Sequence, residues 1–477
     1  MSNKKNYKAL IAFVSMLLLV SCGDPTTSNT SETNFFRTDE LKEDYYSLGM
    51  DSDYRYLKSS GEVNVLVIPV AISGYDDYVT EANREKIRKV FFADCEETSW
   101  ESVSSYYYKS SYDALTITGV VSEWYNPRLT KSDIESHAIQ GADDGGTIYM
   151  AENALDWYKT NHVDINWEKY DSDRDGFIDA LYLVYGCPAD GGNFWAFVNW
   201  DAYSSPDVLS PMVNCYSWAS IDFISEGYGA DGIDAHTFIH ETGHVLGLDD
   251  YYNYDDKGGS PMGAIDMMDN NIIDHDAFSK IALGWMKPYV VSGPSSITIK
   301  KASEYGDAII LSPGWGNSCF DEYLLLEFYT PDGLNAKDSE NAYGGVRGFT
   351  NPGIRLYHVD ARFAYEDQYL SSYVHGATIG NSNSPSYCLD SSYRLINAIS
   401  KDKRSFLTFS NVKANDNSLF YEGDSFSISE YANLFPNGPK KSDSDVYNCF
   451  NNGSSIEYSF TVASIDEDTA TITFASV

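Results

Sequence analysis

Residues 238–252 read FIHETGHVLGLDDYY, a segment in which two histidines recur at helical spacing. His240 and His244 are four residues apart, so a helix places them on one face. Two imidazole nitrogens on one face can bind a single zinc ion, which leaves the neighbouring Glu241 free to take a proton from a water that the zinc activates. The sequence therefore predicts a catalytic zinc site with His240 and His244 as ligands and Glu241 as the general base.

A third ligand is predicted a short distance beyond this helix. Gly247 can adopt a positive φ, end the helix and turn the chain back towards the metal. Asp250 lies ten residues after His240 and completes the pattern HExxHxxGxxD. Two neutral ligands and one anionic ligand leave the fourth position of a tetrahedral zinc ion open for water or a substrate carbonyl. The pattern therefore favours Asp250 as the third zinc ligand.

Three nearby side chains leave other interpretations open. Asp249 and Asp250 can form a solvated acidic pair that binds no metal. His275, in the segment IIDHDAFSK, is the next candidate ligand, because a folded loop can return it to the zinc. His236 lies one turn before His240, and a role in supporting the ligands, or an ordinary surface position, is favoured for it over metal binding.

A methionine-containing segment downstream links the zinc motif to a known family. GAIDMMDNN at residues 263–271 resembles the methionine turn beneath the metal of metzincin-type zincins, with Met268 favoured over Met267. Together with DAFSKIALGWMKP at residues 276–288, it makes the chain similar to the immune inhibitor A-like metallopeptidases of bacteria. The likeness covers most of residues 61–362.

This resemblance implies an exported zinc endopeptidase, with a zincin-fold catalytic domain followed by β-domains. One feature departs from the family. Its members often carry a long N-terminal propeptide, whereas about forty residues separate Cys22 from the first predicted strand of this chain. How latency is achieved is therefore left open.

The segment DSDRDGFID, residues 171–179, has the spacing of a calcium site. Its aspartates alternate along the chain, and Gly176 permits a sharp turn between them. The twelfth position is Tyr182, not a bidentate Glu, so the loop is an incomplete EF-hand that needs ligands from elsewhere. An Asp-rich solvated turn is the alternative. The predicted ligands of this structural calcium ion are Asp171, Asp173, Asp175 and Asp179.

The sequence before the zinc motif mixes strand and helix signals. Residues 62–72 read EVNVLVIPVAI, a run of β-branched and apolar residues that is typical of a buried strand. A helix is expected over residues 81–92. Thr98 and Glu101 have the spacing of a capping box, which predicts a second helix over the following SVSSYYYKSS.

The character of the sequence changes after Pro288. Short alternating runs such as EYLLLEFYT and TATITF dominate, which is typical of β-structure, and the last two runs predict a C-terminal hairpin. We therefore predict an α+β protein. A zincin-like metallopeptidase domain is expected over residues 61–290, followed by a β-rich, sandwich-type region over residues 291–477.

The first residues have the features of an export signal. Three lysines precede a 12-residue apolar run, which is shorter than the roughly 20 residues of a membrane-spanning helix. The run ends in LVSC, which resembles a bacterial lipobox; a chance cysteine after an ordinary signal peptide is the alternative. We predict a lipoprotein signal peptide over residues 1–21 and a lipidated N-terminus and tether over residues 22–60. Lipid on Cys22 would anchor the protein at the extracellular face of the bacterial cell membrane.

Composition narrows the possible partners. The chain has 477 residues and a formal net charge of −37, so nucleic acid and anionic lipid would repel it at long range, and no nucleic-acid partner is expected. A mean hydropathy of −0.35 argues against a polytopic membrane protein. The six cysteines after Cys22 allow 15 full pairings, and buried free thiols are an equally open interpretation.

These features favour a surface-anchored, zinc-dependent endopeptidase that hydrolyses peptide bonds in a protein or peptide substrate. One alternative is a calcium-stabilised adhesin or glycan-binding lipoprotein on an inactive or weakly active zincin scaffold. The presence of Glu241 and of every ligand argues against this. Another alternative is a zinc amidase acting on cell-wall peptides, which would use the same chemistry.

Overall fold

The computed structural model describes residues 34–50, 52–139, 144–202, 204–225, 227, 232–255, 259–364, 378–407, 412–435 and 449–477. The predicted signal peptide and Cys22 lie outside these residues. Several sheets combine with mostly short helices, which is compatible with the predicted α+β class. Within the described ranges, no helix has the length and apolar character needed to cross a membrane.

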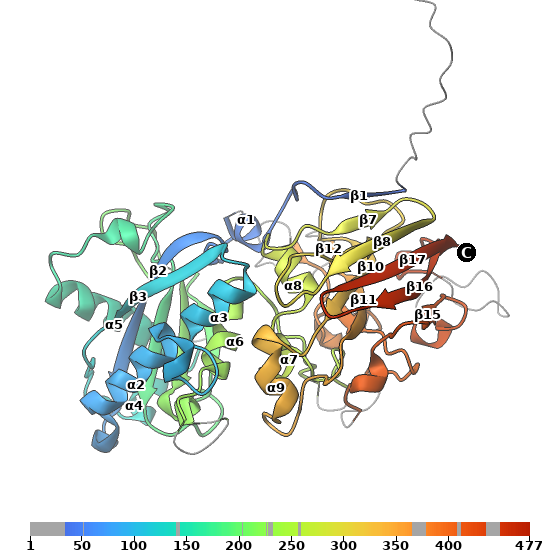
Figure 1. Ribbon diagram of the computed structural model, residues 1–477. Helices are drawn as coiled ribbons and strands as arrows, with labels where there is room; N and C mark the ends of the chain where they lie inside the picture. The colour runs from blue at the N-terminus through green and yellow to red at the C-terminus, as the bar shows by residue number, and fades with distance from the viewer. Residues whose placement is uncertain are drawn as a thin grey trace, which may run out of the picture. The chain divides into compact units, whose positions relative to one another are not determined.

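The first half of the chain is organised around a five-stranded sheet (Figure 1). Its longest strand, Gly61–Ala71, is apolar and buried along most of its length, as expected for a strand covered on both faces. Four strands are parallel, and the edge strand β5 runs antiparallel to β6. In spatial order the strands are β3 (Leu115–Val121), β2 (Gly61–Ala71), β4 (Leu181–Gly186), β6 (Cys215–Ser220) and β5 (Phe197–Trp200).

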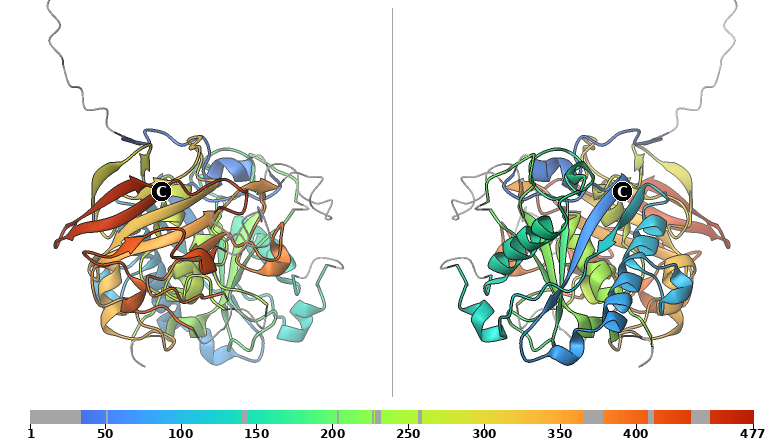
Figure 2. Two further views of the ribbon diagram at one scale, coloured as in Figure 1. Left: turned by 90° about the vertical axis from the view of Figure 1, so that its right-hand side faces the viewer. Right: turned by 90° about the vertical axis from the view of Figure 1, so that its left-hand side faces the viewer.

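Helices cover both faces of this sheet, as the right-hand view of Figure 2 shows. Val63, Val65 and Val67 of β2 pack in one apolar cluster with α2 (Glu81–Phe92), α3 (Val103–Ser110) and α6 (His236–Val245). The alternate residues Leu66 and Ile68 pack on the other face, with α4 (Lys131–Glu135) and α5 (Thr147–Asn161). The helix predicted over residues 81–92 is confirmed as α2.

The start of α3 differs from the prediction. Ser102, not Thr98, is the N-cap: its hydroxyl accepts from the Ser105 backbone N–H at 3.1 Å, and Ser105 Oγ accepts from the Ser102 N–H at 2.9 Å. Glu101 instead accepts hydrogen bonds from Ser105 Oγ and Lys109 Nζ, both at 2.5 Å. The predicted capping box of Thr98 and Glu101 is wrong, because Ser102 and Ser105, a pair with the same spacing, lie closer to the helix.

The second half of the chain is rich in strands. A six-stranded sheet has the order β1 (Phe35–Arg37), β7 (Tyr289–Val291), β9 (Ile309–Leu311), β10 (Glu322–Tyr329), β11 (Gly353–Asp360) and β14 (Ile396–Ala398). A four-stranded sheet has the order β15 (Ser425–Phe426), β16 (Tyr458–Ile465), β17 (Thr469–Ser476) and β8 (Ser295–Lys300). Apolar residues of both sheets share one cluster, and β16 with β17 forms the predicted C-terminal hairpin.

Short elements complete the described fold. They are α1 (Tyr45–Met50), α7 (Met267–Asn270), α8 (Ala277–Ala282), α9 (Ala336–Glu340), β12 (Phe363–Ala364) and β13 (Thr378–Ile379). Residues 34–60, which the sequence assigned to the tether, supply both β1 and α1. The largest apolar cluster contains residues from both sides of position 290, among them Met268 and Tyr357. Five cysteines of the described residues are free thiols: Cys95, Cys187, Cys215, Cys319 and Cys388.

Candidate functional site

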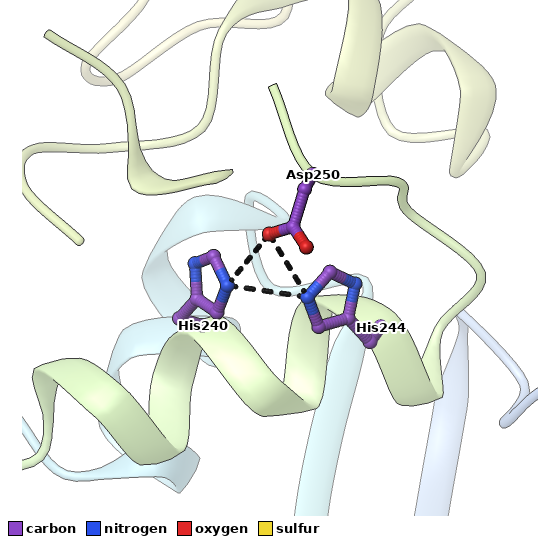
Figure 3. Close-up of side chains that lie close together, drawn as sticks. All are labelled: His240, His244 and Asp250. Atoms are coloured by element: carbon purple, nitrogen blue, oxygen red, sulfur yellow. Dashed lines mark hydrogen bonds and ion pairs between the residues drawn. The ribbon is translucent and has the colours of Figure 1, made fainter. Parts of the chain in front are cut away.

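The structure brings His240, His244 and Asp250 together (Figure 3). The two histidines lie one turn apart on α6, and their Nε2 atoms are 3.1 Å apart. Asp250, on the loop after the helix, places Oδ1 at 3.0 Å from His240 Nε2 and 3.2 Å from His244 Nε2. Gly247 allows this return of the chain with a φ of +104°. Three atoms of the kinds that bind zinc therefore converge on one point.

Backbone carbonyls fix the orientation of both imidazole rings. His240 Nδ1 lies 2.9 Å from the Met267 carbonyl oxygen, and His244 Nδ1 lies 2.8 Å from the Leu248 carbonyl oxygen. Each Nδ1 therefore carries the proton and donates it, so each Nε2 presents a lone pair to its neighbours. Asp250 Oδ1 has no hydrogen-bond partner among the described residues. A cation satisfies all three lone pairs at once, so these residues fit a zinc ion.

A proton is the other way to relieve the repulsion between these lone pairs. Burial lowers the pKa of His244, but the Asp250 carboxylate outweighs burial and raises it to about 10. Burial favours the neutral form of Asp250, yet the two histidines hold the pKa of Asp250 well below its usual range. A zinc ion held by these side chains would take the place of that proton, because it too would neutralise the buried carboxylate.

Glu241 lies beside this group without joining it. Its side chain is 4% exposed, and Oε2 has no hydrogen-bond partner among the described residues. Burial raises the pKa of Glu241, while His240 and His244 lower it. A buried carboxyl with a raised pKa and an unpartnered oxygen beside these side chains is suited to taking up a proton.

The other acidic and histidine candidates have partners elsewhere. Asp249 Oδ1 accepts the backbone N–H of Asp250 at 3.0 Å, and burial raises the pKa of Asp249 to about 6. His275 is buried, and its Nε2 lies 3.3 Å from the Tyr107 hydroxyl. His236 is fully buried between the rings of Trp100 and Tyr343, so it is not a surface residue. None of the three belongs to the group of converging ligands.

Both methionines of the predicted turn support α6. The carbonyl of Met267 accepts from His240, as described above. Met268 packs under the helix at Gly243, where an added Cβ would lie 2.5 Å from the Met268 sulfur. Asp266 is the N-cap of α7 and accepts the Met268 backbone N–H at 2.9 Å. The turn thus supports α6 from below at Gly243, between the two histidines.

Two tyrosines beside the metal group were not singled out from the sequence. The Tyr254 hydroxyl donates a hydrogen bond to Asp250 Oδ2, the oxygen that does not face the histidines. The ring of Tyr252 stacks near that of His240, with centroids 6.4 Å apart. Their only signal in the sequence is their position two and four residues after Asp250, within a chain of 38 tyrosines.

The group of His240, His244 and Asp250 opens into a cavity of about 800 Å³. The edge strand β5 contributes Phe197, Val198 and Trp200 to its lining. The second half of the chain contributes Asn381, Ser382 and Tyr387. The described residues that line the cavity include the acids Glu241, Asp249 and Asp250 but no Lys or Arg. The described part of the site is therefore open to a ligand and offers it no fixed cation.

The predicted calcium loop brings three of its four aspartates together. Asp171, Asp173 and Asp179 each place one carboxylate oxygen within 4.8 Å of the others. Asp171 is 2% exposed, and its Oδ1 has no partner among the described residues. Asp175 is not in the group, because its Oδ2 forms an ion pair with Arg55 Nε at 2.7 Å. Gly176 supplies the predicted turn with a φ of +89°.

Comparison with known proteins gives one distant relationship. The chain is 26% identical over 225 residues to immune inhibitor A of Bacillus thuringiensis subsp. alesti, a match that covers 40% of this chain and 32% of that protein. The chain therefore spans about a third of the length of this curated relative. No family model matches the chain. The match agrees with the resemblance seen in the sequence and supports a distant relationship.

Proposed function

We propose that this protein is a zinc-dependent endopeptidase. The observation that carries the proposal is the convergence of His240 Nε2, His244 Nε2 and Asp250 Oδ1 at 3.0 to 3.2 Å, with Glu241 buried beside them in an open cavity. The distant similarity to immune inhibitor A supports a metallopeptidase.

The chain's own residues account for the steps of peptide hydrolysis. Zinc held by these three side chains supplies Lewis-acid chemistry, polarising the substrate carbonyl and making water more acidic. Glu241 takes the proton from the attacking water, since its free oxygen lies in the same cavity. The raised pKa of Glu241 then suits delivery of that proton to the leaving amine. Tyr254 keeps Asp250 oriented through the second carboxylate oxygen.

The described cavity lining argues against recognition of a substrate's C-terminus. An exopeptidase that recognises a C-terminus needs a cation for the terminal carboxylate, and the described lining has none. The edge strand β5 lies in the wall, and its open side can pair with an extended substrate backbone. An amidase substrate that carries several free carboxylates would face Asp249 and Asp250 without compensation. The same lining therefore also favours a protein or peptide over acidic cell-wall peptides.

The adhesin alternative is less well supported. A buried carboxyl with an unpartnered oxygen destabilises a fold, so the burial of Glu241 Oε2 has no structural explanation among the described residues. A chain that used the zincin-like half only for presentation would gain stability from an apolar residue at this position.

We further propose a structural calcium ion at Asp171, Asp173 and Asp179. In this proposal Asp175 is not a ligand and forms its ion pair with Arg55. Three carboxylates this close repel one another, and oxygen donors of this kind suit calcium. Export by the signal peptide of residues 1–21, lipidation of Cys22 and an extracellular, membrane-anchored location complete the proposal. These rest on the sequence of the first 22 residues.

The proposed activity can be tested with the full chain and a library of proteins and peptides. Internal cleavage should occur, stop with a chelator and return with zinc. Glu241→Ala should lower turnover by about 100- to 10,000-fold, because general-base assistance is lost. It should still bind one zinc, since Glu241 is not a ligand. Glu467→Ala, at an exposed glutamate of the C-terminal hairpin turn, is the matched control and should cleave normally. Equal activity in Glu241→Ala would overturn the proposal.

A further inference from the structure

One wall of the active-site cavity comes from a segment far from the zinc motif. Residues 45–50 and 52–57, here called the N-terminal wall, include α1 and the extended chain after it. Leu57 N donates to the Val245 carbonyl at 2.9 Å, which joins the end of the wall to the end of α6. The wall residues that line the cavity are Tyr45, Leu48, Ser52, Tyr54 and Tyr56.

The wall presents aromatic rings to the cavity. Tyr54 and Tyr56 both pack edge-on against Trp200 of β5, with ring centroids 5.5 and 6.0 Å apart. Tyr45 packs against Tyr56 at 6.4 Å and sits over Gly247, where an added Cβ would lie 2.9 Å from the Tyr45 Cβ. Such a surface binds bulky apolar side chains through burial and ring contacts.

Two polar contacts attach this wall to residues 171–179, here called the aspartate loop. The Tyr46 hydroxyl donates to Asp173 Oδ2 at 2.8 Å, and Arg55 Nε pairs with Asp175 Oδ2 at 2.7 Å. Arg55 Nη1 also donates to the Gly49 carbonyl at 3.0 Å, which ties α1 to the extended chain after it. The position of the wall therefore depends on where Asp173 and Asp175 lie.

The loop itself has the features of a cation site. Asp171, Asp173 and Asp179 converge within 4.8 Å, and the buried Asp171 leaves Oδ1 without a partner among the described residues. Three carboxylates this close repel one another, and a bound cation would offset that repulsion. Asp173 belongs both to the group and to the contact with Tyr46, so a cation that fixes Asp173 also acts on the wall.

We propose that a divalent cation at the aspartate loop sets the position of the N-terminal wall, and thereby the affinity of the cavity for substrates with bulky apolar side chains. The proposal rests on the peptidase function proposed above. In it, Tyr54, Tyr56 and Trp200 contact the substrate, whereas Tyr46 and Arg55 are positioning residues. The cation should therefore change KM and leave kcat nearly unchanged, because His240, His244 and Glu241 have no contact with the loop.

The test uses calcium as the probe, the full zinc-loaded chain, and two quenched peptides that differ only in a Phe or an Ala beside the cleaved bond. Saturating calcium should lower KM for the Phe peptide by about five-fold or more, the scale of common coupling between sites. KM for the Ala peptide and kcat for both peptides should change by less than about two-fold. Tyr46→Phe combined with Arg55→Gln should raise KM for the Phe peptide and remove its response to calcium. Tyr305→Phe combined with Arg88→Gln, at partly exposed sites away from the loop, is the matched control.

Two further measurements separate this inference from the peptidase proposal. Binding of the labelled Phe peptide to Glu241→Ala should tighten with calcium, and this needs no turnover. Calcium binding, followed by calorimetry, should persist in the Tyr46→Phe and Arg55→Gln double variant, since neither residue is in the ligand group. An unchanged peptide affinity with and without calcium would overturn the inference, as would an equal calcium response in the double variant. Absence of cleavage combined with calcium-tightened binding would instead count against the peptidase proposal alone.

Discussion

The two groups of proposed metal ligands differ in what their ligand atoms contact when no metal is bound. In the histidine group, the protons of both rings are directed to backbone carbonyls, so the two Nε2 atoms face each other and Asp250 Oδ1, which has no hydrogen-bond partner among the described residues. In the aspartate loop, most carboxylate oxygens already accept backbone N–H groups of the same loop. Asp179 accepts from Ser172, and Asp173 accepts from Asp175.

This difference separates a site built for a metal from a loop that a metal adjusts. The histidine group has no internal way to satisfy its lone pairs except a trapped proton, so zinc should bind tightly there. The aspartate loop can stay folded through its own hydrogen bonds. Calcium should therefore bind less tightly there, and its effect on stability and substrate affinity should be graded. Occupancy should therefore decide activity at the first site and tune stability and affinity at the second.

The largest expected effect is the loss of zinc from Asp250→Ala. This change removes one of three ligands and the only anionic one, so zinc affinity should fall strongly. Asp249→Ala should have much less effect, because Asp249 bonds to the backbone and not to the metal group. Zinc titration of each purified variant measures the difference.

His275→Ala completes this test. His275 lies against Tyr107 and not among the ligands, so its loss should leave zinc binding near that of the unmodified chain. The assignment of the third ligand is wrong if His275→Ala loses zinc while Asp250→Ala keeps it. The group of His240, His244 and Asp250 would then not be the site built for a metal.

A smaller effect is expected from Tyr254→Phe. The variant loses the hydroxyl that donates to Asp250 Oδ2, and loss of such a supporting contact typically lowers metal affinity by about 10- to 100-fold. Tyr387→Phe is the matched control, since Tyr387 lines the same cavity and its ring packs against that of Tyr254. Competition with a zinc-binding dye gives both affinities. Identical affinities for the two variants would show that the orientation of Asp250 does not depend on Tyr254.

The convergence of His240, His244 and Asp250 could be predicted from sequence because its geometry is local. Helical spacing fixes His240 and His244, and one residue with positive φ, Gly247, returns the chain to them within three residues. The aspartate loop was partly predictable for the same reason. Its spacing placed Asp171, Asp173 and Asp179 correctly in one turn.

What the sequence could not supply are contacts made across the fold. Asp175 has ligand spacing, yet Arg55, 120 residues away, takes its carboxylate. Tyr45 packs over Gly247, and β1 pairs with β7 across roughly 250 residues, so residues assigned to a tether form part of the site. No local pattern marks Tyr45 or Arg55, because neither contact follows from periodicity or capping.

Calcium should stabilise the fold by a moderate amount. A ligand that binds only the folded state at 100 times its Kd adds about 2.7 kcal/mol. Thermal melts in calcium and in EGTA should therefore differ for the unmodified chain. The shift should disappear in Asp171→Asn combined with Asp179→Asn. A shift of the same size in this double variant would place the calcium elsewhere, and the aspartate loop would then not be a metal site.

The smallest expected effect concerns a third group of the same residue types that holds a proton in place of a metal. His236 Nδ1 lies 2.5 Å from Asp234 Oδ1, and its Nε2 lies 3.5 Å from Asp338 Oδ1. Burial lowers the pKa of His236, but the two carboxylates outweigh burial and raise it to about 9. A histidine between two carboxylates is satisfied by one proton, whereas two histidines facing one carboxylate leave a gap that a cation fits.

The sign of the resulting pH dependence follows from the raised pKa. His236 binds its proton more tightly in the folded state, so its stabilisation is complete below the unfolded pKa of about 6.5 and is lost as pH rises towards 9. One proton changes the free energy of unfolding by at most about 1.4 kcal/mol between pH 7 and pH 8. Denaturant unfolding at these two pH values should show this fall in the unmodified chain and a smaller one in His236→Gln. Asp338→Asn gives a second measure if His236→Gln does not fold. Equal slopes in the unmodified chain and both variants would mean that His236 is neutral, and the contrast between a proton-filled and a metal-filled group would then have no support.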